Sequence, residues 1–205
     1  MWVLLFVACE GERDVADTKL DPIDPPPLVV RDVPPVAPGA DEPMAQISAA
    51  NCSDLADGGP VAGPGCITAK VSCGDAVAGH TKGGAQAFDT RFYEAKYCTP
   101  ATTNHDSGDE RVYALTMPEG DHRAVVYLDT PCADLDLAAI RVPDHATCPT
   151  QATEVAQCEM WPKPSTQREK VELVSRGPTT WLLVVEGKGD AEGAFGLTVR
   201  CLDGL

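Results

Sequence analysis

The sequence predicts an all-β fold, a sandwich or a barrel, from its composition and from the spacing of its apolar residues. Aromatic residues make up 5% of the 205 residues, whereas Gly and Pro number 18 each, a composition typical of short strands and turns. Past residue 51, short apolar segments are divided by turn residues, and several alternate with the period of two that half-buried strands have. No segment carries a helical stripe over ten residues. The length suits one domain with a tail.

The first clear pair of strands lies at 110–117 and 122–129. In the first segment Tyr113, Leu115 and Met117 alternate with other residues, so the three side chains share one face of an extended chain. The residues between the two segments, 118–121, form the turn Pro-Glu-Gly-Asp. We therefore expect an antiparallel hairpin.

Three further strands are expected near the end of the chain. Residues 170–174 alternate charged and apolar side chains. The run 179–186 has five consecutive apolar residues, 181–185, and is therefore apolar on both faces, which predicts a central strand. The last strand, 194–201, should place Phe195, Leu197 and Val199 inward.

Charge and motifs exclude several functions. The formal net charge of -15 repels phosphate backbones and anionic head groups, so we expect no nucleic-acid partner. The motifs GxSxG, HExxH, GxxxxGK[ST] and GxGxxG after a strand do not occur, although each would mark a familiar catalytic or phosphate site. The sequence predicts that the protein is not an enzyme; an enzyme of unrecognised type is the weaker alternative.

Nine cysteines predict an oxidising compartment, since a cytosolic chain rarely has so many. Cys9 lies far from the others at the end of an apolar run, and the remaining eight form an even set. Four disulfides are expected, but cysteine positions alone permit 105 pairings.

The apolar leader at residues 1–8, followed by Cys9, resembles the signal and lipobox of bacterial lipoproteins, here Phe6-Val7-Ala8-Cys9. The resemblance implies cleavage before Cys9 and a lipid anchor on its sulfur. The family prefers Leu where Phe6 stands, and no Lys or Arg precedes the run, which suggests a start truncated by a few residues. The run is too short to span a bilayer, which takes roughly 20 residues. The alternatives are a secreted protein without lipid or an accidental apolar start.

Residues 9–51 read as an acidic, Pro-rich and disordered linker. Pro-rich acidic segments favour extended conformations without a packed core, so this linker would hold the folded part away from the membrane. A proline-motif ligand for a partner domain is the alternative reading.

Within the folded part, residues 52–205, the segment from about Ser72 to Cys201 resembles the bacterial pre-peptidase C-terminal domain. Three parts of the chain carry the resemblance. Residues 107–113 are similar to the family's Gly-x-Glu-x-x-Tyr entry strand, and 134–137 to its Asp-x-Asp-Leu element. Residues 183–187 with 193–199 are similar to its closing hairpin. The family often has Asp where Glu186 stands and Tyr where Phe195 stands. The resemblance implies an antiparallel, jelly-roll-like β-sandwich, here stapled by disulfides, that acts as an accessory module.

In that architecture Cys73 opens the first strand region and Cys201 ends the last strand, so a bridge between them would tie the two ends. Cys148 and Cys158 flank a polar loop like a local staple of related bacterial sequences. The remaining pairs are Cys52 with Cys66 and Cys98 with Cys132. Zinc is the competing reading, but no CxxC pair occurs and the four histidines are scattered.

Two sets of residues are candidate ligand contacts. Acidic side chains could supply oxygen ligands to a structural Ca²⁺, which some members of the resembled family hold; solvated acidic loops are the alternative. These acids are Asp129, Asp134, Asp136, Asp190 and Glu192. Aromatic side chains could contact a polysaccharide, or simply pack on the sandwich: Trp161, Phe92, Tyr93 and Tyr97. No other cofactor is expected.

Leader, linker and stapled sandwich together predict a non-catalytic lipoprotein of the cell envelope, in the outer membrane or on the cell surface. Its partners would be the membrane, through the lipid, and an unknown surface protein or polysaccharide. The alternative is a secreted accessory or carbohydrate-binding module.

Overall fold

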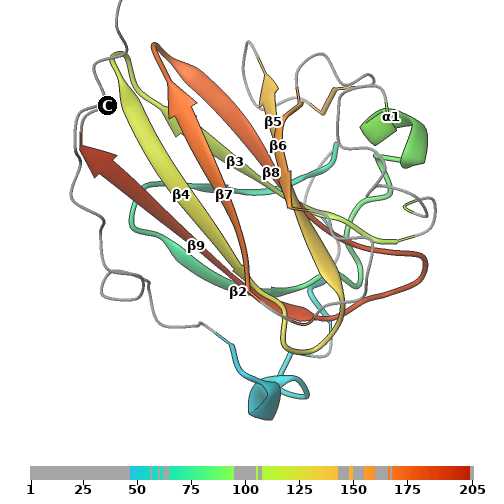
Figure 1. Cartoon of the computed structure of the whole chain (residues 1–205). Coiled ribbons are helices and arrows are strands. Elements are labelled where there is room, and N and C mark those ends of the chain that lie inside the picture. Colours follow the sequence, from blue (N-terminus) through green and yellow to red (C-terminus); the bar gives the residue numbers. More distant parts are fainter. Residues whose placement is uncertain are drawn as a thin grey trace, which may run out of the picture. The chain divides into compact units, whose positions relative to one another are not determined.

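The computed structural model is a sandwich of two β-sheets (Figure 1). It describes residues 47–55, 57–59, 61, 65–94, 105, 108–142, 148–149, 155–159, 166 and 168–203. All belong to one compact unit, Glu42–Leu205. The leader, Cys9 and the linker up to residue 46 lie outside the described residues. The first described element is a short 3-10 turn, η1 (Ala49–Asn51), and Ile47 just before it is buried.

The larger sheet has five strands in the order β1-β3-β8-β5-β6. Their bounds are β1 Ile67–Val71, β3 Arg111–Met117, β8 Thr179–Gly187, β5 Leu135–Val142 and β6 Val155–Glu159. All nine residues of β8 are buried, and β8 lies between β3 and β5. The predicted central strand is confirmed.

The smaller sheet has four strands in the order β2-β9-β4-β7. Their bounds are β2 Ala76–His80, β9 Ala194–Asp203, β4 His122–Asp129 and β7 Glu169–Ser175. Every pairing in this sheet is antiparallel.

Alternate side chains of both sheets form the main core. Tyr113, Leu115 and Met117 of β3 meet Phe195, Leu197 and Val199 of β9 in one buried cluster, as the alternation predicts. A fully buried side chain of this size stabilises the fold by about 1.5–3 kcal/mol, so the interleaved core is the main source of stability.

The predicted hairpins do not form. β3 lies in the five-stranded sheet and β4 in the four-stranded sheet, and the same holds for β8 and β9. The turns at 118–121 and 188–193 therefore carry the chain from one sheet to the other. The expectation was wrong because alternation shows which face of a strand is buried, whereas the strand partner depends on the whole topology.

The five-stranded sheet is not wholly antiparallel, because β1 pairs with β3 in parallel. A long connection, residues 72–110, joins these two strands and allows the parallel arrangement.

A second apolar cluster covers the outer face of the five-stranded sheet. It includes Val112 and Val184 from the strands and Phe88, Phe92 and Tyr93 from the segment that contains the short helix α1 (Thr90–Glu94). In Figure 1 α1 lies on the side of this sheet that faces away from the four-stranded one. Five residues are too few for a helical period to be detected, so the sequence did not predict α1.

Three disulfides join distant segments. Cys73–Cys201 is confirmed, with Cα atoms 5.3 Å apart and a sequence separation of 128. The other two correct the expected pairs: Cys52 bonds Cys132 and not Cys66, and Cys66 bonds Cys148. The local staple Cys148–Cys158 and the pair Cys98–Cys132 are thereby wrong. Short sequence separation was a poor guide because the sandwich brings together residues 80 and 82 positions apart.

No helix among the described residues is long and apolar enough to cross a membrane.

A buried acidic cluster as the candidate functional site

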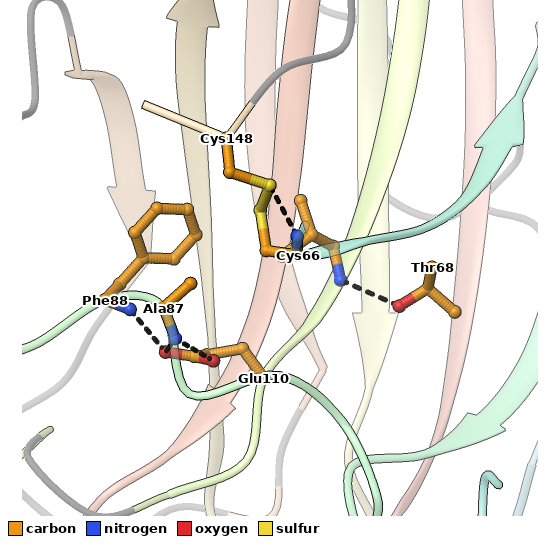
Figure 2. The surroundings of a disulfide bond; sticks show 7 residues. Cys66, Thr68, Ala87, Phe88, Glu110 and Cys148 are labelled. Carbon is orange, nitrogen blue, oxygen red and sulfur yellow. Dashed lines mark hydrogen bonds between the residues drawn. A yellow bond between two sulfur atoms is a disulfide. The ribbon is translucent and has the colours of Figure 1, made fainter. Parts of the chain in front are cut away.

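Glu110 connects the segment before α1 to the five-stranded sheet through hydrogen bonds. Its carboxylate accepts hydrogen bonds from the backbone N–H groups of Phe88, at 2.8 Å, and Ala87, at 3.0 Å (Figure 2). Its backbone also exchanges two hydrogen bonds with Ala85. Glu110 is fully buried, so it acts as an internal support for this segment.

Tyr93 and Glu186 make a second link between α1 and the sheet. The phenolic hydroxyl of Tyr93 donates a short hydrogen bond to the Glu186 carboxylate, and both residues are 0% exposed. Glu186 lies on β8, the most buried strand. A charged group there requires a partner of this kind.

His105 lies between two buried carboxylates. Its Nε2 is 3.5 Å from Asp136 Oδ2 on β5, and its Nδ1 is 3.5 Å from Glu186 Oε1. Its ring also packs edge-on to Tyr93, with centroids 5.4 Å apart. On the solvent side Lys188 Nζ lies 3.7 Å from Asp136 Oδ2. We call Tyr93, His105, Glu110, Asp136, Glu186 and Lys188 the buried acidic cluster.

Burial dominates the electrostatics of this cluster. It raises the pKa of Glu110 to about 8, and the neighbouring Glu186 carboxylate adds to the effect, while the hydrogen bonds from Phe88 and Ala87 oppose it. Burial first, and then Glu186, also raises the pKa of Tyr93 well above its ordinary value. Glu110 therefore favours its protonated form near neutral pH, and Tyr93 stays a hydrogen-bond donor.

These groups include types used in acid–base catalysis, but their side chains face one another. Apart from Lys188, at 17%, none is more than 1% exposed. A general acid or base must reach a proton of its substrate. The arrangement is therefore suited to holding the segment 85–94 and His105 against the sheet.

A second charged anchor is Arg111, which is 2% exposed. Its guanidinium donates hydrogen bonds to the backbone carbonyls of His80, Lys82 and Gly59, at 2.8, 2.7 and 2.5 Å. The backbone of Gly58 passes so close that a Cβ there would collide with this guanidinium. Arg111 thus fixes the loops at residues 57–59 and 80–84.

The structure separates the candidate calcium ligands. Asp129 forms an ion pair with Arg168, 2.6 Å between Oδ1 and Nε, whereas Asp136 belongs to the buried acidic cluster. Asp134 is partly buried, and Asp190 and Glu192 are exposed on the β8–β9 connection. The described residues contain no group of three or more acids, histidines or cysteines placed to hold a metal ion. Calcium binding stays a prediction.

The aromatic candidates divide into two pairs. Phe92 is 7% and Tyr93 0% exposed, and both pack in the outer apolar cluster with Phe88. They are core residues and are not available to a surface ligand. Trp161 and Tyr97 lie outside the described residues, as does Cys98; of Cys158, in β6, the backbone alone is described.

Sequence reasoning missed His105, Glu110, Arg111 and Glu186. One signal was available: Glu186 continues a run, 179–185, that already predicted burial on both faces. A carboxylate in such a strand needs a buried partner. His105 and Arg111 carried no comparable signal, since isolated charged residues beside turns are usually exposed.

No family model matches the sequence. No curated protein matches it either. Among solved structures, the crystal structure of the pre-peptidase C-terminal domain of a collagenase from Bacillus anthracis aligns with a TM-score of 0.42 and 12% sequence identity, over 67% of this chain and 98% of that one. The sandwich architecture given above rests on the strand pairing of this chain itself.

Proposed function

We propose that the protein is an exported module of the bacterial cell envelope, anchored by lipid at Cys9, that binds or organises other surface components and catalyses no reaction. The observation that carries this proposal is the set of three disulfides, which join Cys52 to Cys132, Cys66 to Cys148 and Cys73 to Cys201. Such bridges form and persist in oxidising compartments outside the cytosol.

The burial of the side chains in the buried acidic cluster supports a non-catalytic role. Its carboxylates and imidazole are engaged with one another and with backbone amides. Groups held in this way stabilise a fold and are not positioned to exchange protons with a substrate.

Lipid attachment is tested in the organism from which the chain comes, by comparing wild type with Cys9→Ser. The wild-type protein should enter the detergent-rich phase of a Triton X-114 separation, and its intact mass should correspond to a chain that starts at Cys9 and carries acyl groups. The Cys9→Ser protein should stay in the aqueous phase. Equal partitioning of the two proteins, or a mass without acyl groups, would remove the anchor and favour the secreted module.

The disulfide readout is separate. The same samples, alkylated without reduction, report whether the cysteines of the folded part are oxidised in the cell. Free thiols at Cys73 or Cys201 would contradict export itself, whatever the result at Cys9.

A further inference from the structure

The outer face of the four-stranded sheet gathers positive charge in an acidic protein. Ala124, Val126 and Leu128 of β4 point into the core, so the alternate residues Arg123, Val125 and Tyr127 point away from it. The flanking strands β7 and β9, which lie on either side of β4 in Figure 1, present further outward side chains. We define the cationic face by Arg123, Arg168, Lys170 and Arg200.

Acidic side chains neutralise this face in part. Glu172 is shared by two cations: Arg123 binds one carboxylate oxygen, and Lys170 Nζ lies 2.8 Å from the other. The hydrogen bond from Lys170, and next that from Arg123, lowers the pKa of Glu172, so this carboxylate is ionised. Asp129 is occupied by Arg168.

Arg200 lies on β9 opposite Val125, as Glu172 does on β7, and no ion pair to Arg200 occurs within the described part of the chain. Four cations against two carboxylates leave this face at +2. The formal net charge of the whole chain is -15, so the residues outside this face carry a net charge of -17. The excess positive charge centres on Val125, between Arg123, Lys170 and Arg200.

Two of these cations are well exposed, and Arg200 is partly exposed. The side chains of Arg123 and Lys170 are 40% and 45% exposed, above the nearly covered Val125 and Tyr127. The large apolar side chains exposed in the described part, Val174 and Leu202, flank Arg123 on the two neighbouring strands. The surface therefore has charged groups over its centre and apolar groups at one end.

We propose that this cationic face binds an extended anionic polysaccharide of the cell envelope, whose carboxylate groups contact Arg123, Lys170 and Arg200. The proposal deepens the envelope role given above by naming the class of partner. Guanidinium groups form paired, charge-assisted hydrogen bonds with carboxylates. Arg123 and Arg200 can do so while Lys170 contributes a point charge.

Surface anatomy argues against a folded protein as the partner. Protein interfaces have an apolar, aromatic centre and a polar rim; here Val125 and Tyr127, at the centre, are covered, and Val174 and Leu202 stand at one end. A bilayer is disfavoured too. An anionic bilayer surface is extended, so the net negative charge of the whole chain would repel it. A single polysaccharide strand on the cationic face lies within the Debye length, about 8 Å, of its charges. The charges of that face therefore dominate its interaction with the protein.

The test measures binding of the disulfide-intact full chain to polygalacturonate, a linear polyuronate, by affinity electrophoresis at low ionic strength. The wild-type protein should be retarded, and added salt should weaken the retardation. The triple variant R123Q/K170Q/R200Q should bind at least about tenfold more weakly. Glu172→Gln should bind about two- to threefold more tightly, because it removes a carboxylate that competes with the ligand.

A matched control keeps the net charge equal. K70Q/R91Q/R141Q also removes three positive charges, at exposed positions away from the cationic face, and should bind like the wild type. Thermal unfolding of each variant confirms that it is folded.

The proposal is overturned if the wild-type protein does not bind polygalacturonate, or if the two triple variants bind equally. Equal or tighter binding to polyglutamate would instead identify an acidic peptide as the partner, and binding to phosphatidylglycerol vesicles would identify a lipid surface. None of these outcomes depends on Cys9, so failure here is distinct from failure of the lipid-anchor test.

Discussion

Tyr93 donates its phenolic hydrogen to the carboxylate of Glu186 inside the outer apolar cluster, and this bond joins α1 to the central strand of the five-stranded sheet. Both side chains are fully buried. The pair explains how a strand that is buried along its whole length carries a carboxylate.

Replacing Tyr93 by Phe should destabilise the protein by about 1–3 kcal/mol, because Glu186 stays buried and loses a donor. Tyr113→Phe is the control: Tyr113 is also buried, but its hydroxyl has no hydrogen bond among the described residues, so its loss should change the free energy of unfolding by less than about 0.5 kcal/mol. Guanidinium chloride unfolding measures both. Equal effects would contradict a role for the Tyr93–Glu186 bond.

Glu110 should make stability depend on pH. Its pKa rises from 4.5 to about 8 on folding, chiefly through burial. Below pH 4.5 both states are protonated and the stabilisation is fully present. Between pH 4.5 and 8 the unfolded chain loses the proton that the folded chain keeps, so rising pH destabilises the fold, by at most about 1.4 kcal/mol per pH unit. Above pH 8 the folded chain also loses this proton, and the stabilisation by protonated Glu110 is fully lost.

The measurement compares wild type with Glu110→Gln, since the other titrating groups cancel in the difference. The stability of the wild type relative to the variant should fall between about pH 5 and pH 8. A constant difference across this range would show that Glu110 does not titrate as described.

The alternation of apolar residues predicted which faces are buried. Leu115 and Leu197 lie in the core as expected, and the doubly apolar run at 179–186 forms the central strand. Partners could not be predicted in the same way, because Met117 and Ala124 pack in one core from strands of different sheets. Alternation is a local property, whereas the crossing between sheets depends on the whole topology.

The buried acidic cluster could not be predicted from the sequence, for a related reason. Glu110 stands at the start of a strand, and acids there are usually solvated. His105 meets Asp136 and Glu186 through contacts between positions far apart in the chain. Of the candidate acids named from the sequence, Asp136 alone belongs to this cluster, so residue type was informative but the assembly was not predictable.

Arg111 should be sensitive even to a conservative change. Arg111→Lys keeps the charge but cannot reproduce the planar set of donors that reaches the carbonyls of His80, Lys82 and Gly59. We expect a loss of about 2–4 kcal/mol in the free energy of unfolding, since hydrogen bonds to a charged group contribute about 1.5–3 kcal/mol each. Arg141→Lys, at an exposed position of β5, is the control and should change little. If both variants unfold at the same denaturant concentration, Arg111 is not the anchor of these loops.

The disulfide pairing is tested by digesting the alkylated, non-reduced protein and identifying the linked peptides. The expected links are Cys52–Cys132, Cys66–Cys148 and Cys73–Cys201, and the even count predicts that Cys98 and Cys158 also resist alkylation.

The double variant Cys73→Ala/Cys201→Ala should lose about 4–5 kcal/mol of stability, because this bridge closes the longest loop and its removal frees the unfolded chain most. Removing Cys52–Cys132, which closes a shorter loop, should cost slightly less. A peptide that links Cys52 to Cys66, or Cys148 to Cys158, would contradict the strand arrangement itself, since the sandwich holds each of these cysteines beside a different partner.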